Sequence, residues 1–353
     1  KEFKFLAIGN PHSKFDQHGR FATPKKGWAS VSIEDDEWET ERGVCVRFDG
    51  MKSPNILAGK EKYSFLINEE QVRQAQKYDG EDSPKFWKYT RGMWSPEGVC
   101  KTVLSESLVE KYRAMMPAIF HKHSHMIAGL DPAFNGGDRC VIQLGRYGDF
   151  DNGKMGIQLE KNEIIEINAQ SSEPVHFQIS KRVQQICEEN KILPQHLAID
   201  ATGEGGGLCD ILAKTWSPAI QRVEFGGKAS DRPVSPEDHR KSSDVYANKV
   251  TELWFSVRQW VINEQLRGMS HDAVIEFCSR MFDDEKRMTI IERKVEMKAR
   301  TGKSPDFADA VTLVVEMARR LGGYATAHRP TNGMSSWDSM VREYDSIYHD
   351  TFA

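Results

Sequence analysis

The chain has 353 residues, of which 39% are hydrophobic and 28% are charged, and its formal net charge is −4. This composition is typical of a protein with hydrophobic cores, and the length is sufficient for two domains. No stretch reaches the about 18 consecutive apolar residues that indicate a membrane-spanning helix. The net charge excludes a protein that coats nucleic acid with its whole surface, but it allows a local basic groove.

The first region, residues 1–120, is rich in aromatic residues, Gly and Pro. Short apolar runs predict strands at 5–8, 28–33 and 44–48, separated by long loops. Residues 69–78 predict an amphipathic helix. The region lacks the regular alternation of a complete domain.

From residue 121 the pattern becomes that of a folded domain. Apolar and alternating runs predict three successive strands, at 125–133, 139–148 and 154–165. Helices and strands then alternate, and this order predicts an α/β mixed sheet with helices on both faces. The later elements are expected at 180–192 (helix), 197–200 (strand), 207–216 (helix), 220–225 (strand), 246–266 and 271–281 (helices), 287–294 (strand) and 304–321 (helix).

The segment TGKSPDFADA, residues 301–310, admits two interpretations. Gly302-Lys303-Ser304 looks like the end of a phosphate-binding loop, but that motif also needs a Gly five residues before its last Gly. Met297 stands at that position, and no other Gly-Lys-Ser/Thr occurs in the chain. The phosphate-loop interpretation therefore fails, and we expect no ATP hydrolysis by this chain.

The second interpretation makes the segment the start of a helix that presents carboxylates. Ser304 is a suitable N-cap, and Pro305 fits the first helical position. A rotation of about 100° per residue places Asp306 at the edge of the buried stripe and turns Asp309 toward solvent. A carboxylate beside the core needs a cationic partner, so Asp306 is the stronger candidate for a site. The alternative is a carboxylate that only stabilises the helix N-terminus.

Two further aspartates stand at the ends of predicted strands. Asp131 ends the run MIAGL and precedes a Gly-Gly loop, and Asp200 ends the run LAI and precedes the glycine-rich ATGEGGGL. Taken alone, each has a simpler explanation, a turn at Asp131 and a plain or phosphate-binding loop after Asp200. Together with Asp306, they supply three carboxylates from three elements of one mixed sheet.

Three acids without a His or Cys partner favour a hard divalent cation such as Mg²⁺ and disfavour zinc. Two such ions about 4 Å apart hold the attacking and leaving oxygens of a phosphodiester displacement. The sequence thus predicts a two-metal site of Asp131, Asp200 and Asp306, with Asp309 as an auxiliary. One more acid, Glu252, is expected on the surface of its helix.

A basic segment precedes Asp306. Between residues 286 and 303, seven Lys and Arg residues stand against two acids, Glu292 and Glu296, which gives a local charge of +5. Such charges contact DNA phosphates without reading the base sequence, and the alternative is a solvated charged segment. The predicted DNA-contacting residues are Lys294, Lys298, Arg300, Lys303 and, in a Pro/Ser-rich loop earlier in the chain, Lys228.

Three segments resemble the nuclease half of the large terminase subunit of tailed bacteriophages: AGLDPAFNGGDRCVIQLG, LAIDATGEGGGLCDIL and ARTGKSPDFADAVTL. The resemblance spans about residues 125–325, and the second and third motifs are specific in combination. FLAIGNPHSKFDQHGRF also resembles the late part of the terminase packaging ATPase. The chain departs from that family because the two nucleotide-binding motifs that should precede this segment are missing.

The resemblance implies a ribonuclease H-like nuclease domain over residues 121–325. An incomplete α/β remnant of the packaging ATPase and a linker would precede it over residues 1–120, and a flexible tail would follow over residues 326–353. The implied activity is a metal-dependent DNA endonuclease that cuts concatemeric viral DNA during packaging into the procapsid. By motif, the family's metal-binding acids match Asp131, Asp200 and Asp306, with Asp309 as the auxiliary.

The same resemblance implies a cofactor and partners. The cofactor would be Mg²⁺ or Mn²⁺ in a two-metal site. The partners would be double-stranded DNA, the portal protein and the small terminase subunit, without a membrane. The place of action would be the host cytoplasm, transiently at the portal vertex of the procapsid. Two alternatives stay open: another ribonuclease H-like enzyme, such as a transposase or resolvase, and a non-catalytic module that docks on the portal.

Overall fold

The structure is a computed structural model that describes residues 5–11, 14, 17–81, 83–96, 101–134, 137–235, 238–284 and 287–325. The tail expected at 326–353 lies outside these residues. The described chain divides into two compact units, one up to Lys101 and the other from Thr102. No helix within the described ranges is long and apolar enough to span a membrane.

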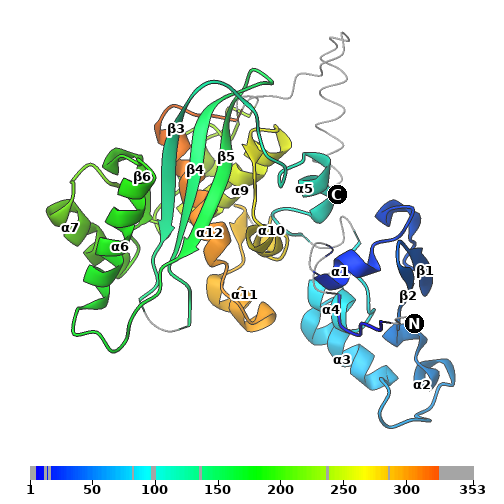
Figure 1. The fold of residues 1–353 in the computed structure, drawn as a ribbon. Helices are drawn as coiled ribbons and strands as arrows, with labels where there is room; N and C mark the ends of the chain where they lie inside the picture. The colour runs from blue at the N-terminus through cyan, green and yellow to red at the C-terminus, as the bar shows by residue number, and fades with distance from the viewer. Residues whose placement is uncertain are drawn as a thin grey trace. The chain divides into compact units, whose positions relative to one another are not determined.

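The first unit combines short helices with a two-stranded hairpin (Figure 1). Its core contains Phe86, Trp87 and Met93, and Trp28 lies edge-on to Trp94 with 4.8 Å between ring centroids. Its elements are α1 (Gln17–Ala22), η1 (Trp28–Ser30), β1 (Glu37–Thr40), β2 (Gly43–Val46), η2 (Gly50–Lys52), α2 (Pro54–Leu57), α3 (Glu69–Asp79) and α4 (Pro84–Tyr89).

Two strands predicted for this unit were wrong. Residues 5–8 have no regular structure and expose their large apolar side chains, and residues 28–33 begin with the 3-10 helix η1. An apolar run becomes a strand only where a neighbouring strand takes up its backbone hydrogen bonds, and the run alone does not show such a neighbour. The helix predicted at 69–78 is confirmed as α3, and the strand predicted at 44–48 is confirmed in β2.

The second unit is built on a six-stranded mixed sheet with the order β7-β6-β3-β4-β5-β8. The first three strands along the chain are antiparallel neighbours, and the next two lie parallel to the first of them and beyond it. This arrangement is ribonuclease H-like, which confirms the predicted fold class. The strands are β3 (Phe120–Asp131), β4 (Val141–Phe150), β5 (Met155–Ile164), β6 (Leu197–Asp200), β7 (Gln221–Val223) and β8 (Leu266–Arg267).

Helices cover both faces of this sheet, as the sequence predicted (Figure 1). On one face, α6 (Val175–Glu189) and α7 (Gly205–Thr215) bury an extensive core cluster against β3, β4 and β6. On the other face, α12 (Asp306–Arg320) crosses the sheet, and α9 (Lys249–Ile262) and α10 (His271–Phe277) pack against α12. The remaining elements are α5 (Glu106–Lys111), η3 (Pro194–His196), α8 (Ser242–Val245), β9 (Phe282–Asp283), β10 (Ile290–Ile291) and α11 (Lys294–Thr301).

Gly129 lets α12 lie directly on the central strand β3. A Cβ atom at this position would come within 2.5 Å of the Ala310 carbonyl oxygen and 2.7 Å of Leu313 Cβ. Because side chains alternate along a strand, Gly129 and Asp131 face the same side of the sheet, which is the side of α12. The close approach therefore brings the start of α12 to the end of β3.

Residues 102–118 join the second unit. The backbone N–H groups of Val103 and Leu104 donate to the carbonyl oxygens of Arg280 and Phe277, and both side chains are fully buried. The sequence had grouped this stretch with residues 1–120. The assignment of residues 1–120 to the end of a packaging ATPase domain and a linker stays a prediction.

Candidate functional site

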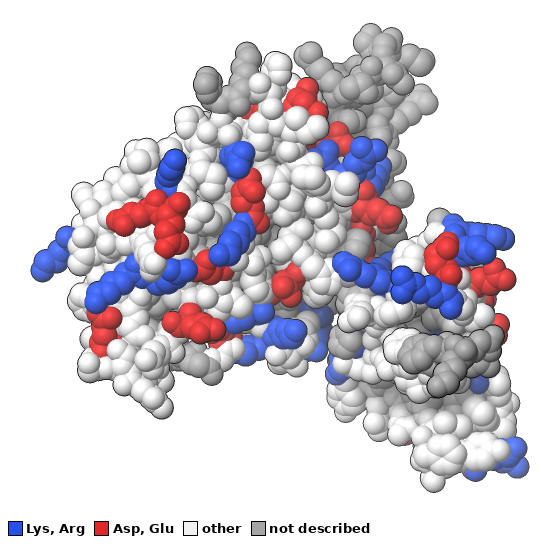
Figure 2. All heavy atoms as spheres, viewed as in Figure 1, with Lys and Arg blue, Asp and Glu red and all other residues white. Residues whose placement is uncertain are grey.

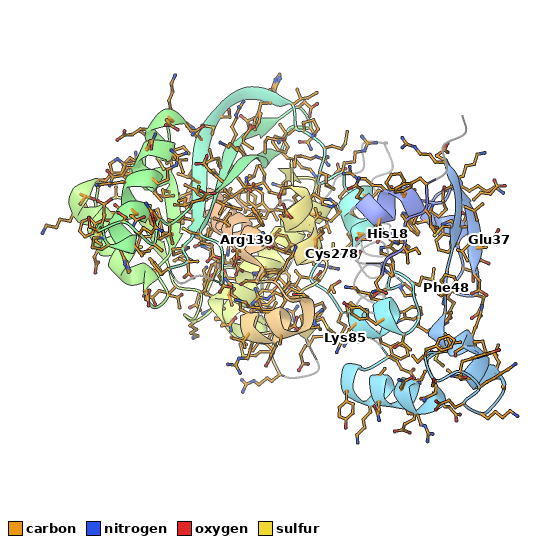
Figure 3. All side chains as sticks on the ribbon, turned by 60° about the horizontal axis from the view of Figure 1, so that its bottom comes forward. His18, Glu37, Phe48, Lys85, Arg139 and Cys278 are labelled. Carbon is orange, nitrogen blue, oxygen red and sulfur yellow. The ribbon has the colours of Figure 1, made fainter. Side chains whose placement is uncertain are left out.

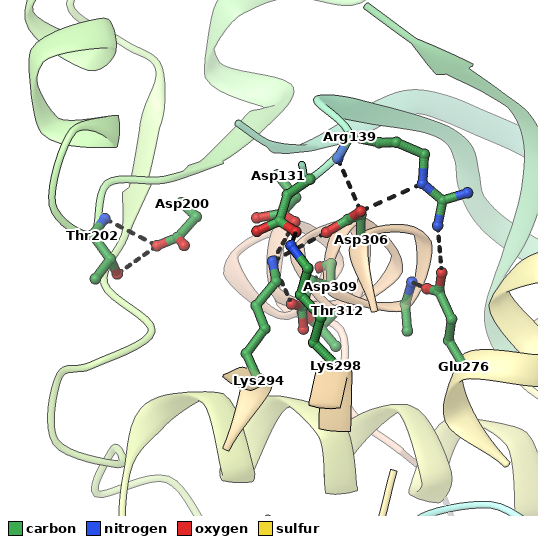
Figure 4. Close-up of polar contacts among 12 residues, drawn as sticks. Asp131, Arg139, Asp200, Thr202, Glu276, Lys294, Lys298, Asp306, Asp309 and Thr312 are labelled. Carbon is green, nitrogen blue, oxygen red and sulfur yellow. Dashed lines mark hydrogen bonds and ion pairs between the residues drawn. The ribbon is translucent and has the colours of Figure 1, made fainter. Parts of the chain in front are cut away.

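Three aspartates meet where β3 ends and α12 begins (Figure 4). Asp131 is the last residue of β3, and Asp306 and Asp309 lie in the first turn of α12. The ammonium of Lys294 stands between them, with Nζ 3.2 Å from Asp131 Oδ2, 3.3 Å from Asp306 Oδ1 and 3.3 Å from Asp309 Oδ2. We call Asp131, Asp306, Asp309 and Lys294 the acid cluster. It surrounds one cation position with three buried carboxylates.

The second oxygens of the two α12 aspartates are held by fixed donors. Asp306 Oδ2 accepts from the backbone N–H of Arg139 at 3.0 Å and from its Nε at 3.4 Å. Asp309 Oδ1 accepts from Trp254 Nε1 at 2.8 Å and from Arg280 Nη1 at 3.3 Å. Each carboxylate therefore has one oxygen anchored and one turned toward the central ammonium. Groups that orient metal ligands act in this way.

One oxygen of the acid cluster is left without a hydrogen bond. Asp306 Oδ1 is buried and accepts none from the described residues, although Lys294 Nζ is 3.3 Å away. Buried polar atoms normally have a hydrogen-bond partner. An ionic contact without a directed hydrogen bond suits a spherical cation, and carboxylate oxygens are the ligands that hard divalent ions prefer. The residue types of the acid cluster suit such an ion. As the side chains are arranged in the structure, no group of three or more His, Cys, Asp or Glu residues within the described ranges could hold a metal ion.

Burial and repulsion oppose the ionisation of Asp131, and the ammonium of Lys294 favours it. Burial raises the pKa of Asp131 well above its usual range, Lys294 opposes that rise, and Asp309, Asp200 and Asp306 add to it. Burial lowers the pKa of Lys294, but the three carboxylates raise it by more than burial lowers it. The pKa of Lys294 therefore lies above its ordinary value. The carboxylates thus favour the charged ammonium, and the ammonium reduces the rise in the pKa of Asp131 without cancelling it.

Asp200 lies beside the acid cluster without touching the central ammonium (Figure 4). It ends β6, and its Oδ1 accepts from the Thr202 backbone N–H at 3.0 Å and from Thr202 Oγ1 at 2.6 Å. Burial raises its pKa, the bonds from Thr202 lower it, and Asp309 raises it again, with a net rise. The structure therefore brings Asp131, Asp306 and Asp309 together and leaves Asp200 next to them. Its role as a metal ligand stays a prediction.

Two predictions about the start of α12 were wrong. Asp309 is 2% exposed instead of facing solvent, because α9 and α10 pack on α12 as well as the sheet. Ser304 is not the N-cap: Pro305 occupies that position, and no side-chain cap bond is made there. Glu276 of α10 replaces the cap, since its Oε2 accepts from the Ala308 backbone N–H at 2.7 Å.

Arg139 and Glu276 were not predicted from the sequence as site residues. Glu276 Oε1 accepts from Arg139 Nη2 at 3.0 Å, so the two side chains connect α10 with Asp306. Burial raises the pKa of Glu276 to about 8. Arg139 lies inside the first terminase-like motif, which was a usable signal. Glu276 lies in a short amphipathic helix and had none.

The basic segment before Asp306 forms α11, and several of its cations have partners within the protein. Lys294 belongs to the acid cluster. Lys298 Nζ contacts Asp138 Oδ1, and Arg300 forms an ion pair with Glu292 at 2.6 Å. These contacts attach α11 to the site from one side.

Two of the predicted DNA-contacting residues, Lys228 and Lys303, are exposed. Figure 2 shows Lys and Arg side chains mixed with Asp and Glu over the visible face, without a continuous patch of one sign. Contact of DNA with Lys228, Lys303 or the three cations of α11 stays a prediction.

No protein-family model and no curated protein matches the chain. Solved structures of similar fold include the nuclease domain of the large terminase subunit of the bacterial virus Sf6, a mutant solved with manganese and beta-thujaplicinol. It is 14% identical with a TM-score of 0.45, covering 61% of this chain and 98% of that chain. The large terminase nuclease domain of P22 is 12% identical with a TM-score of 0.33, covering 60% and 89%. Thermus thermophilus RuvC is 12% identical with a TM-score of 0.27, covering 57% and 98%.

These likenesses concern the fold alone, and the chemistry of this chain has to be inferred from its own side chains. Two of the similar structures belong to the family that the sequence motifs resemble. The chain is thus similar in fold to terminase nuclease domains.

Proposed function

We propose that this chain is a metal-dependent DNA endonuclease that cuts concatemeric viral DNA during genome packaging. The observation that carries the proposal is the convergence of one oxygen each from Asp131, Asp306 and Asp309 on a single cation position. The position lies at the end of the central strand of a ribonuclease H-like sheet. A ligand set of carboxylates alone favours Mg²⁺ or Mn²⁺.

The charges at the site favour a divalent ion in place of Lys294. The four aspartates, Asp131, Asp200, Asp306 and Asp309, contribute −4 when all are ionised. Arg139, which contacts Asp306, and Arg280, which contacts Asp309, contribute +2. Without the lysine, the sum of −4 and +2 is −2, which one divalent ion balances. A second ion would bring excess positive charge, which the phosphates of bound DNA would offset.

Bound divalent ions would activate the attacking water and stabilise the charge that develops on the phosphate. The side chains supply what those ions need. Asp131 comes from a rigid strand, and Asp306 and Asp309 come from one buried helix, so their separation is fixed by the fold. Trp254 and Arg280 fix the orientation of Asp309 in the absence of DNA, and sites that are organised in advance lose little in reorganisation.

Cleavage of supercoiled plasmid tests the proposal. The purified chain should nick or linearise plasmid with Mg²⁺ or Mn²⁺ and be inactive in EDTA, with little sequence preference. Asp131→Asn should abolish cutting. Asp210→Asn is a matched control, since Asp210 is an exposed acid of α7 that pairs with Arg222. Cutting that survives chelation, or equal activity of Asp131→Asn, would exclude the proposed site. A strong preference for four-way junctions over linear duplex would instead favour a resolvase.

One observation favours a second candidate, a non-catalytic module that docks on the portal. Lys294 already places a positive charge against three carboxylates, and such a group can be purely structural. Titration calorimetry with Mn²⁺ separates the two. A folded protein that neither binds Mn²⁺ nor cuts DNA would support the docking module.

The packaging role extends the proposal beyond the site and rests on the sequence motifs. It includes the portal protein and the small terminase subunit as partners and the portal vertex as the place of action. In a packaging reaction that is supplied with a complete packaging ATPase, heads should fill while Asp131→Asn leaves concatemers uncut. Normal cutting of concatemers by this variant would remove the packaging part of the proposal.

A further inference from the structure

Arg139 has hydrogen-bond donors that the acid cluster does not use. Its Nε contacts Asp306, its Nη2 contacts Glu276, and its guanidinium carbon lies 4.4 Å from the ring centroid of Phe307. Its third guanidinium nitrogen, Nη1, makes no hydrogen bond or ion pair within the described ranges (Figure 4). A third of the side chain, 33%, is exposed. Arg139 is therefore fixed on one side and open on the other.

The other cations of the site are already occupied. Arg280 donates to Asp309 and to the carbonyl oxygen of Glu292, stacks on Trp254, and has only 4% of its side chain exposed. The Lys294 ammonium faces three carboxylates. Among the cations that touch the acid cluster, Arg139 alone combines an exposed surface with a nitrogen that the described residues leave without a contact.

We propose that Arg139 binds a phosphate of the DNA backbone beside the phosphate that is cut. This inference rests on the proposed nuclease function and adds a substrate contact to it. The guanidinium presents several N–H groups in a fixed plane that matches phosphate oxygens. Its contacts with Asp306, Glu276 and Phe307 already restrict its rotamers, so less side-chain entropy is lost when it binds. Arg139 is labelled in Figure 3, and its backbone N–H and Nε both donate to Asp306, the first residue of α12.

Two roles of Arg139 can be separated by measurement. A residue that only positions Asp306 would change cation affinity and cleavage, but it would leave metal-free DNA binding unchanged. A residue that binds a phosphate would change DNA affinity in EDTA, where no cleavage occurs. The salt dependence of binding adds a second criterion, because each phosphate contact that is lost lowers the slope of log K against log salt concentration by about 1.

The experiment is fluorescence anisotropy of a labelled duplex in EDTA at several salt concentrations. Arg139→Gln should weaken binding about tenfold, the size expected for one charge-assisted hydrogen bond, and lower the salt slope by about 1. Arg139→Lys keeps the charge but loses the planar fork, so it should keep the slope and lose less affinity. The lysine variant also keeps the test usable if the glutamine variant unfolds in thermal denaturation.

Arg146→Gln is a matched control. Arg146 also stacks on a phenylalanine, Phe120, at 5.5 Å, pairs with a carboxylate, Glu160, at 3.2 Å, and has 43% of its side chain exposed. In the β3–β4 pairing, Arg146 lies opposite Met126, and Met126 precedes Asp131 by five residues. Its removal should change neither the affinity nor the salt slope.

The outcomes separate this inference from the proposed function. If the wild-type protein binds DNA and Arg139→Gln binds it equally well with the same slope, Arg139 is only a positioning residue and the inference fails while the nuclease proposal stands. An equal loss in Arg146→Gln would also overturn it, as an unspecific charge effect. A wild-type protein that neither binds nor cuts DNA would overturn the proposed function, and the inference with it.

Discussion

Helix α12 carries a buried charge cluster toward each end, and the two clusters differ in how their charges are satisfied. The acid cluster lies at its N-terminus. Two turns further along, Glu316 and Arg319 of α12 meet Lys249 and Glu252 of α9, and we call these four residues the α9–α12 network. In both clusters the carboxylates are almost fully buried.

The α9–α12 network has fixed partners for its central acid. Glu252 accepts from the backbone N–H and the hydroxyl of Ser230, both at 2.7 Å, and pairs with Arg319 and Lys249. Burial raises the pKa of Glu252, but Arg319 and Lys249 outweigh burial and lower it to about 2. The acid is therefore ionised at any ordinary pH.

The acid cluster shows the opposite properties. The pKa of Asp131 is raised, one Asp306 oxygen has no hydrogen bond within the described residues, and the central cation is a lysine with 35% of its side chain exposed. A buried carboxylate with fixed partners supports the fold, because removing one partner leaves an uncompensated charge. A carboxylate whose only central partner is an exchangeable cation can accept another cation instead.

The largest effect should come from Asp306→Asn. The amide still accepts from Arg139, but the charge and the oxygen that face the central cation are lost. Plasmid cleavage should fall by more than the roughly 10–100-fold cost of losing a group that only orients a metal ligand. Thermal denaturation should show a Tm within a few degrees of the wild type. If the variant cuts normally but its Tm falls well below that of the wild type, the acid cluster supports the fold and not the cleavage, as the α9–α12 network is expected to do.

Asp309→Asn distinguishes the two α12 acids. Its Oδ2 faces the same cation position, so cleavage should also be lost. In contrast to Asp306→Asn, it leaves the buried Arg280 without its carboxylate, so stability should fall as well. A fully stable Asp309→Asn would show that Arg280 does not depend on this charge.

Glu252→Gln should affect stability and spare catalysis. Breaking a buried ion pair from one side costs about 3–5 kcal/mol, which for a unit of this size lowers Tm by roughly 6 °C or more. Cleavage per folded molecule should be unchanged below the melting range. Loss of activity in a fully folded variant would show that the α9–α12 network also acts on the site.

The same variant has a defined pH dependence. The pKa of Glu252 is about 2 in the fold against an ordinary 4.5. A lowered pKa stabilises the fold fully above the ordinary value, and that stabilisation disappears as the pH falls toward the folded-state value. Urea denaturation should therefore show a constant gap between wild type and Glu252→Gln above about pH 5, and the gap should narrow between about pH 4.5 and pH 2.

Gly129→Ala should have an intermediate effect on both stability and cleavage. The added Cβ would meet the backbone of α12 at 2.5 Å, and backbone cannot move aside as a flexible side chain does. Overpacking of this kind costs about 1–3 kcal/mol, and it displaces Asp306 and Asp309 from Asp131. Gly203→Ala is the control. A Cβ at Gly203 would meet no atom within 4 Å, but the residue has a φ of +60°, so this variant adds backbone strain without a steric contact. Equal loss of cleavage in both variants would argue against the contact.

The sequence predicted the strands β3–β7 and the longer helices of the second unit because their signals are local. The strand predicted at 287–294 was largely wrong, since only Ile290–Ile291 form β10 and the helix α11 begins at Lys294, and β8, β9 and α8 were not predicted. Alternation in the β3–β5 strands, the glycine-rich turn after Asp200 and the periodicity of α12 each depend on neighbours in the chain. Which side of each helix is buried was predicted less well. Asp309 and Glu252 were both expected at the surface and are 2% and 1% exposed, because α12 and α9 are covered by several elements that a single helical pattern does not reveal.

Contacts over long sequence separations explain the rest. Arg139 and Glu276 are 137 positions apart, and Lys294 is 163 positions from Asp131. The run of basic residues around Lys294 favours a solvated, DNA-contacting segment. Nothing within this run shows that Lys294, the first residue of α11, contacts three buried aspartates. Such pairings require the fold, since they depend on where α11 lies relative to the end of β3.

Replacing Lys294 by Met should produce the smallest effect and is the most direct test of exchange. Lys294 competes with a divalent cation for three carboxylate oxygens, so its removal should tighten Mn²⁺ binding by about tenfold, or 1.4 kcal/mol. The gain depends on pH. Lys294 lowers the pKa of Asp131, so without it Asp131 binds a proton at higher pH, and that proton competes with the metal. Calorimetry should find the gain larger at alkaline pH and smaller as the pH falls.

Lys298→Met is the control for this exchange. Lys298 lies one turn further along α11 and contacts Asp138 instead of the acid cluster, so its replacement should leave Mn²⁺ affinity unchanged at every pH. If Lys294→Met binds Mn²⁺ more weakly than the wild type even at pH 9, the lysine supports the cation site instead of competing for it. The acid cluster would then resemble the α9–α12 network, because its cation would be a permanent part of the fold. The Asp306 oxygen without a hydrogen bond would not indicate a cation that can be exchanged.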